Sequence, residues 1–319
     1  MQGSRSRRSL PKVKGKARIS PRDHFFHSDG LTLHYAEWGD PAHETLVLVH
    51  GNRDQCRSWD FFVSELFARG SPDPHVVALD LRGHGDSDWS PPGRGYQHQD
   101  FLRDLAGLLR HLRKDSATFI GHSLGGSMAL LFAGCFPERV RKLVLIEAVG
   151  PFARSDGDVP KHLAQWVEED RSRVEKFFYP TLKDAARAIR KRFPLIPEAA
   201  CDHMAGYGTK VTDRGYLWKY DPRVRFPSYS TFSEGQVRAF IQRLNCPTLL
   251  IYGAEGDFMQ SPRAARLGLF KNSEAVGIAG SGHHVPHERP DGLAKVVAAF
   301  LREQPSPIPS PWQGRGQSL

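Results

Sequence analysis

A short apolar run that ends in a Gly-x-Ser-x-Gly pattern constrains the fold of this chain more than any other feature. Residues 117–120 are apolar, β-branched or aromatic, residues 121–125 read Gly-His-Ser-Leu-Gly, and residues 127–136 carry apolar side chains with a helical period. This order predicts a buried strand, a sharp turn and a helix. The glycines two positions either side of Ser123 let neighbouring backbone pass close to the turn, which leaves the Ser123 hydroxyl exposed. Ser123 is therefore the candidate nucleophile.

The rest of the chain alternates between strand-like and helix-like segments. A continuously apolar run, typical of a strand buried on both faces of a parallel sheet, occupies residues 45–49, and further buried strands are predicted at 76–81, 140–146 and 247–252. Segments with helical spacing lie between or after them, at residues 58–68, 97–112, 124–136, 234–244, 262–270 and 290–302. Two short alternating runs around Ser-Asp-Gly at 28–30 predict an opening β-hairpin. We expect an α/β fold with a doubly wound, mostly parallel sheet.

The alternation fails between residues 150 and 232, which predicts an inserted segment. Aromatic residues, prolines and charged helical stretches such as 182–192 fill this region, and no buried strand is evident. We expect a helical cap at 150–232 on a core formed by 23–149 and 233–303.

The two ends of the chain have compositions that are typical of disorder. Residues 1–22 carry eight Lys and Arg and no acidic residue, and residues 304–319 hold four of the chain's 23 prolines among Ser, Gln and Gly. Neither segment contains enough apolar side chains to form a core, so we expect a disordered basic tail and a disordered Pro/Ser-rich tail.

The net charge of +9 comes from the basic tail, because removing its eight bases from 44 leaves 36 against 35 acidic residues. A near-neutral body argues against a nucleic-acid partner. No apolar run approaches the roughly 18–20 residues of a membrane helix, so we expect no membrane span. The four cysteines are scattered, without a Cys-x-x-Cys pair, which excludes a disulfide framework and favours a cytoplasmic location.

A serine nucleophile needs a base for its proton and a third group that fixes the tautomer of the base. Residues 280–290 read Gly-Ser-Gly-His-His-Val-Pro-His-Glu-Arg-Pro, a loop with three histidines between the last strand and the last helix. Here the sequence resembles the alpha/beta-hydrolase superfamily, whose terminal pattern is Gly-His, an acid five positions on and often Pro seven positions on. His283 fits this register, and His284, one position off, is the alternative base.

The resemblance also implies an acid after the penultimate strand, where residues 253–257 read Gly-Ala-Glu-Gly-Asp. Asp257 is the predicted acid, and the chain order Ser, Asp, His supports it. Many members place the Asp three residues after the glycine, whereas Asp257 is four residues after it. Glu255 is therefore an alternative acid. Glu147, at the end of the strand 140–146, is a further alternative, because some relatives draw the acid from that location.

Acyl transfer develops a negative oxygen that needs preorganised backbone donors. One expected donor is the amide of Leu124, at the N-terminus of the helix after the nucleophile. The second is the amide of Asn52, because residues 50–52, His-Gly-Asn, resemble the family's His-Gly motif.

Together these residues predict a serine hydrolase that cleaves carboxylic esters through an acyl-enzyme, with a small, fairly apolar acyl substrate and no cofactor. The same residues suit hydrolytic C–C, thioester, lactone or amide cleavage, or a ligand-binding homologue without turnover. Serine at the nucleophile position argues against the epoxide-hydrolase and haloalkane-dehalogenase branches, which use Asp there. No metal is expected at the three histidines, because Pro286 interrupts the helix that would align them. The oligomeric state is left open.

Overall fold

The computed structural model describes residues 20–69, 74–169, 174, 176–226, 228 and 230–303. The predicted tails lie outside these residues, except that 20–22 are described and Arg22 already begins the first strand. Among the described residues, none of the helices combines the length and the apolar character needed to cross a bilayer.

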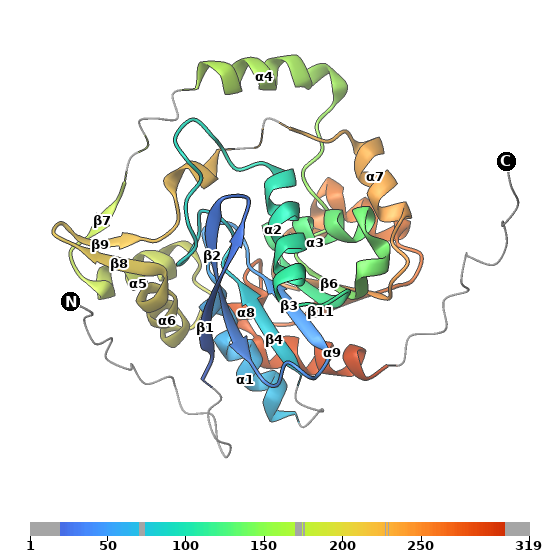
Figure 1. Cartoon of the computed structure of the whole chain (residues 1–319), viewed down its shortest axis with the longest axis horizontal. Helices are drawn as coiled ribbons and strands as arrows, with labels where there is room; N and C mark the ends of the chain where they lie inside the picture. Colours follow the sequence, from blue (N-terminus) through green and yellow to red (C-terminus); the bar gives the residue numbers. More distant parts are fainter. Residues whose placement is uncertain are drawn as a thin grey trace, which may run out of the picture.

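An eight-stranded sheet forms the centre of the molecule, with the strand order β1-β2-β4-β3-β5-β6-β10-β11 (Figure 1). Its strands are β1 (Arg22–Ser28), β2 (Leu31–Trp38), β3 (Thr45–Val49), β4 (His75–Leu79), β5 (Ala117–His122), β6 (Val140–Ile146), β10 (Thr248–Gly253) and β11 (Ser273–Ile278). β2 runs antiparallel to β1 and β4, whereas all neighbours from β4 to β11 are parallel. The predicted mostly parallel, doubly wound sheet is confirmed.

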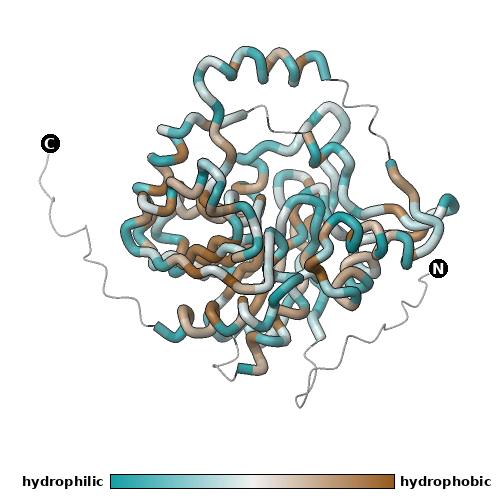
Figure 2. The backbone as a smooth tube through the Cα atoms, turned by 180° about the vertical axis from the view of Figure 1, so that it is seen from behind, coloured by the Kyte–Doolittle hydropathy of each residue, from teal (hydrophilic) through white to brown (hydrophobic). Residues whose placement is uncertain are grey.

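Helices cover both faces of this sheet. The longer ones are α1 (Asp60–Ala68), α2 (His98–His111), α3 (Leu124–Cys135), α7 (Glu234–Gln242) and α9 (Pro290–Arg302), with the short α8 (Val285–Glu288) before α9. Side chains of α2, α3 and α7 share one core with the sheet, and side chains of α1, α8 and α9 share the other. Apolar segments concentrate in the centre of the backbone trace, and hydrophilic ones in its outer loops (Figure 2).

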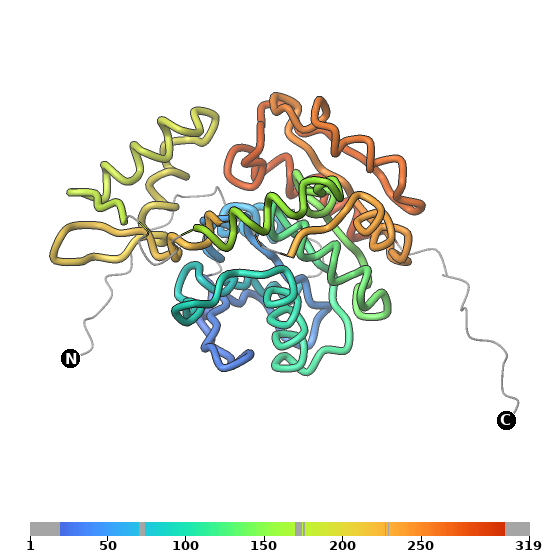
Figure 3. Tube along the Cα trace, turned by 90° about the horizontal axis from the view of Figure 1, so that it is seen from above, coloured from blue at the N-terminus to red at the C-terminus, as the bar shows by residue number. Residues whose placement is uncertain are grey.

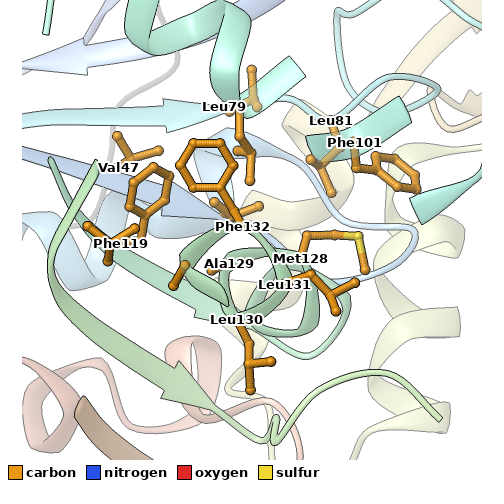
Figure 4. Close-up of a cluster of buried hydrophobic side chains, with 14 of the residues drawn as sticks. Val47, Leu79, Leu81, Phe101, Phe119, Met128, Ala129, Leu130, Leu131 and Phe132 are labelled. Carbon is orange, nitrogen blue, oxygen red and sulfur yellow. The ribbon is translucent and has the colours of Figure 1, made fainter. Parts of the chain in front are cut away.

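Strand β5 shows why the buried strands read as continuously apolar. Successive side chains of a strand point to opposite faces, so Phe119 packs into the core beneath α3 while Ile120 packs into the core beneath α1 and α9. The ring of Phe119 lies 5.2 Å from the ring of Phe132 of α3, near Val47 (Figure 4). Both faces of β5 are therefore packed against apolar cores, and Ser123 directly follows this well-packed strand.

The predicted opening hairpin is confirmed. β1 pairs with β2 so that Ser28 faces Leu31, and only Asp29 and Gly30 connect the strands. Both residues have positive φ, 51° and 77°, as a tight two-residue hairpin turn requires.

The insertion at 150–232 is only partly helical, so the prediction of a helical cap without strands is incomplete. It contains α4 (Val159–Glu168), α5 (Leu182–Arg192) and α6 (Glu198–Gly208), together with β7 (Phe178–Tyr179), β8 (Thr209–Thr212) and β9 (Gly215–Trp218). These strands form a separate antiparallel sheet in the order β7-β9-β8. Strands of two to four residues are too short to show a period in the sequence.

Helices α5 and α6 have a small apolar core of their own, which includes Ala185, Ile189 and Cys201. Seen from above, these helices and the β8–β9 hairpin, coloured yellow-green and yellow, lie together at one end of the molecule (Figure 3). Helices α5 and α6 therefore form a separate unit of the cap, whereas Val224, near the end of the insertion, belongs to the main core that includes α2 and α3.

Short 3-10 helices make up much of the remaining regular structure. They are η1 (Cys56–Trp59), η2 (Pro137–Arg139), η3 (Asp156–Asp158), η4 (Pro222–Arg225), η5 (Phe258–Gln260) and η6 (Pro262–Leu269). The helix predicted at 262–270 is thus a 3-10 helix.

His34 of β2 gives the fold a dependence on pH. Its Nδ1 lies 2.7 Å from Asp80 and its Nε2 lies 3.1 Å from Asp23. Burial lowers the pKa of His34, but the two carboxylates outweigh burial and raise the pKa from 6.5 to about 9. Because the folded pKa exceeds the unfolded one, the stabilisation is complete below about pH 6.5 and is lost as the pH rises through about 9.

We therefore expect the free energy of unfolding to fall by on the order of 2 to 3 kcal/mol between these two pH values. Urea titrations of the wild type and of His34→Gln across this range measure the effect. The variant should be less stable at the lower pH and should lack this part of the decline. Equal pH slopes in the two proteins would show that the His34 pair does not cause it.

Candidate active site

Three sequence-distant residues meet at the carboxyl edge of the sheet. Ser123 lies between β5 and α3, Glu147 directly follows β6, and His283 lies in the loop between β11 and α8. The carboxyl ends of parallel strands face the same edge, which is where open α/β sheets place their ligands. The topology therefore brings these side chains together.

A continuous hydrogen-bond chain joins the three side chains. His283 Nε2 lies 3.1 Å from Ser123 Oγ, and His283 Nδ1 lies 3.1 Å from Glu147 Oε2. With the proton on Nδ1 donated to the Glu147 carboxylate, Nε2 is free to accept the Ser123 proton. Of the two histidines that the sequence allowed as base, the structure therefore brings His283 to Ser123.

The Glu147 carboxylate is held from the opposite side by β10. The amide of Gly253 donates to Glu147 Oε1 at 2.8 Å, and the amide of Glu147 donates to the carbonyl of Ile251 at 2.8 Å. The Glu147 side chain is 4% exposed, whereas that of His283 is 46% exposed. A buried acid bonded through both oxygens fixes the ring of a more accessible histidine.

The predicted pair of Asp257 and His283 is not formed. Asp257 is exposed and precedes η5, and within the part of the chain that the structure describes its carboxylate makes no hydrogen bond to His283. Glu255 points elsewhere, because it accepts a 2.7 Å hydrogen bond from the amide of Gly280. Of the three candidate acids, Glu147 is the one that contacts His283, because β6 lies directly beside β10 and between β10 and the serine strand β5.

The backbone at Ser123 is strained, as the sequence pattern predicts. Ser123 has φ 52° and ψ −112°, which no regular structure uses. The flanking glycines are required by close backbone contacts: a Cβ on Gly121 would lie 2.6 Å from Gly125, and a Cβ on Gly125 would lie 2.2 Å from the carbonyl oxygen of Val49. Tight packing of β3, β5 and α3 thus maintains the turn.

This strain predicts a difference between two substitutions that both remove the hydroxyl. Ser123→Gly should be more stable than Ser123→Ala by about 1 kcal/mol, because glycine adopts positive φ freely and this gain exceeds its larger entropy loss on folding. Chemical denaturation of the two variants measures the difference. Equal stability of the two variants would mean that a residue with a Cβ causes no backbone strain at position 123.

The two predicted oxyanion donors lie beside Ser123 in different ways. Leu124 is the first residue of α3, so its amide belongs to the first turn, whose N–H groups have no partner within the helix. Asn52 lines the cavity that contains Ser123, and a Cβ on the preceding Gly51 would lie 3.5 Å from the Ser123 Cβ. Their roles as donors remain a prediction.

A group of buried and partly buried histidines surrounds His283. His122 donates from Nε2 to the carbonyl of His283 at 2.8 Å, and His287 Nε2 lies 3.1 Å from Asp54 Oδ2. His284 makes no hydrogen bond through either ring nitrogen among the described residues. Burial, with the neighbouring charges of His287 and His283, lowers the pKa of His284 to about 3, so this ring is neutral. The contact between Asp54 and His287, which ties the loop after β3 to α8, has no signal in the sequence.

Outside this site, one buried group among the described residues has side chains of the kind that bind metals. Ligand atoms of His34, Cys56 and Asp80 lie within 4.8 Å of one another. Asp80 is already occupied, because one carboxylate oxygen bonds to His34 at 2.7 Å and the other accepts from the amide of Cys56 at 2.6 Å. These internal hydrogen bonds account for the group as part of the fold.

A cavity of about 380 Å³ opens above Ser123. The core contributes the catalytic side and the cap contributes mainly apolar side chains, among them Tyr179, Ile189, Phe193, Met204 and Trp218. An apolar wall facing a polar, hydrogen-bonded serine suits a small organic ligand with a reactive polar group.

Residues 46–296 match the model of the Alpha/beta hydrolase family. The chain belongs to this family. A probable serine hydrolase of Drosophila melanogaster is 27% identical over 290 residues, covering 83% of each chain. Human epoxide hydrolase 4 is 26% identical over 293 residues, covering 86% of this chain and 77% of that one. The crystal structure of a hypothetical protein from Pseudomonas aeruginosa PAO1 superposes with a TM-score of 0.81 at 25% identity, covering 89% of this chain and all of the other.

The relatives of this alpha/beta hydrolase support a hydrolase activity, and the Gly-x-Ser-x-Gly turn at Ser123 has the strand, turn and helix context of a nucleophile elbow. Their names include both serine hydrolases and epoxide hydrolases, so the relatives support a hydrolase and leave the scissile bond to the chemistry of the site.

Proposed function

We propose that this alpha/beta hydrolase cleaves carboxylic esters through a covalent acyl-enzyme. The observation that supports this most strongly is the hydrogen-bond chain from Ser123 through His283 to Glu147, with distances of 3.1 Å at both steps. The arrangement supplies a nucleophile, a base and a group that holds the base in one tautomer.

In the first half of the reaction, Ser123 Oγ attacks the ester carbonyl carbon while His283 Nε2 takes the hydroxyl proton. Glu147 stabilises the resulting imidazolium through the hydrogen bond to Nδ1. The tetrahedral oxyanion accepts hydrogen bonds from the amides of Leu124 and Asn52. His283 then protonates the departing alkoxide, the C–O bond of the ester breaks, and the acyl group remains on Ser123.

In the second half, His283 takes a proton from water, and the hydroxide attacks the acyl carbon. The bond to Ser123 Oγ breaks, the serine recovers its proton from His283, and the carboxylic acid leaves. The apolar cap side chains around the cavity favour a fairly apolar acyl group.

The serine nucleophile also separates this proposal from epoxide opening, the reaction named for some relatives. A serine that opened an epoxide would form an ether, which has no carbonyl for water to attack, so the enzyme would not turn over. An ester, thioester or lactone leaves a hydrolysable acyl-serine. Ester hydrolysis with Ser123 is therefore the stronger reading.

Covalent labelling tests the proposal. A fluorophosphonate probe should add one group to the protein, and peptide mass mapping should place it on Ser123 and lose it in Ser123→Ala. A p-nitrophenyl ester series from acetate to dodecanoate should show turnover that the probe abolishes. Turnover that persists after complete labelling, or in Ser123→Ala, would refute the serine mechanism.

A further inference from the structure

A second cavity of about 200 Å³ adjoins the active-site cavity. The two share Arg53, Tyr179, Arg192, Trp218 and Tyr220 as lining residues. Ser123 and His283 line only the first cavity, so the second extends away from the reacting atoms. A ligand longer than one acyl group would reach it from Ser123.

Four cationic side chains from separate segments line this second cavity. Arg53 follows β3, Lys176 precedes β7, Arg192 ends α5 and Arg225 ends η4. No acidic side chain is among the described residues that line it. A concave surface that carries charge of one sign focuses the field and attracts the opposite charge.

These four cations lack ion-pair partners among the described residues, in contrast to their neighbours. Arg223, two positions before Arg225 in η4, bonds to Asp221 at 2.6 Å. The four instead lie against aromatic rings or solvent; the guanidinium of Arg192, for example, lies 5.3 Å from the ring centre of Phe193, and Lys176 Nζ lies 5.6 Å from that of Trp89. Their charges are therefore available to a ligand.

Tyr220 shows that three of these charges converge. Burial raises the pKa of the Tyr220 phenol, and the positive charges of Arg53, Arg192 and Arg225 act in the opposite direction. Three guanidinium groups from three segments therefore line the second cavity together with Tyr220, which also lines the first. The backbone of Arg53 has φ 62°, a conformation that favours glycine, so placing an arginine there costs folding free energy.

We infer that the substrate carries an oxyanion, a carboxylate or a phosphate, at the end remote from the scissile ester, and that Arg53, Lys176, Arg192 and Arg225 bind it. The apolar wall of Ile189, Phe193 and Met204 would contact the chain between the two ends. Guanidinium groups match both kinds of oxyanion with paired N–H donors. This inference rests on the proposed ester hydrolysis and specifies its substrate class.

The test uses matched p-nitrophenyl esters on the full-length protein: hydrogen adipate with its free carboxylate, the methyl-capped adipate, and an ester of equal length that ends in a phosphate. The wild type should show kcat/KM about tenfold or more higher for an anionic ester than for the capped one, an advantage that falls as salt is added. Whichever anion shows it identifies the oxyanion.

Arg192→Gln and Arg225→Gln should each reduce the ratio of anionic to neutral kcat/KM by about tenfold. Lys191→Gln is the matched control. Lys191 is the exposed neighbour of Arg192 and lines neither cavity, so the substitution removes the same charge outside the proposed site. The control should keep the wild-type ratio.

Turnover of the capped ester without an anionic preference would overturn the inference and leave the proposed function standing. If none of the three esters is cleaved and no probe attaches to Ser123, the proposed function fails, and calorimetric binding of adipate and of inorganic phosphate then decides the inference. Binding that Arg192→Gln and Arg225→Gln weaken and Lys191→Gln preserves supports the anion site, and the absence of such binding overturns it.

Discussion

His283→Ala should lower kcat for ester hydrolysis by about 10⁴-fold or more, because it removes the group that takes and returns the proton of Ser123. His284→Ala should lower kcat by at most about tenfold, since its two ring nitrogens bond to nothing among the described residues and its loss leaves the chain of hydrogen bonds intact. Steady-state rates with one p-nitrophenyl ester measure both effects, and circular dichroism checks that both variants fold.

The pair also tests which histidine of the Gly-His-His sequence is the base. A dead His284→Ala beside an active His283→Ala would reverse the assignment. Equal losses in both would mean that the loop collapses when either ring is removed, and the probe-labelling rate of Ser123 would then be expected to fall equally in the two variants.

Glu147→Gln should lower kcat by about 10³- to 10⁴-fold without unfolding the protein. The amide oxygen of glutamine still accepts the hydrogen bond from the amide of Gly253, so the side chain stays in place. Its NH₂ group then faces His283 Nδ1, which must accept instead of donate, and the proton moves to Nε2. A histidine protonated on Nε2 cannot take the proton of Ser123.

Asp257→Asn is the matched control, because it replaces the carboxylate of the acid that the sequence favoured with a neutral amide of the same shape. It should retain kcat within about twofold, as surface substitutions away from the reacting atoms usually do. A loss in Asp257→Asn that equals or exceeds the loss in Glu147→Gln would show that the acid changes position when substrate binds.

These outcomes bear on what local sequence can specify. The strand, turn and helix around Ser123 were predictable because each depends on neighbours within a few residues: an apolar period, glycines at fixed positions and a serine between them. The loop of His283 was predictable from its glycines and proline, whereas the choice of His283 over His284 came from the register of the family's terminal pattern.

The acid was not predictable in this way. Glu147 and Asp257 both follow a buried strand, and each is compatible with its own segment. What separates them is the lateral order of the sheet, in which β6 lies between β5 and β10, so that Glu147 emerges next to the serine. That order depends on contacts between residues more than a hundred positions apart, such as the bond from Gly253 to Glu147. The cationic side chains of the second cavity were missed likewise, because they come from four distant segments.

The position of Glu147 has a consequence for how such an enzyme changes over generations. The proposed nucleophile and the proposed acid both belong to one β5–α3–η2–β6 unit, and the proposed base comes from the loop after β11. In the loop after β10, Asp257 and Glu255 take no part in this hydrogen-bond chain, and Glu255 instead accepts from the amide of Gly280, three residues before His283. Changes at Asp257, beyond the contact between Glu255 and Gly280, alter the surface near the site while the reacting groups keep their spacing, so this position is one where specificity can change without rebuilding the catalyst.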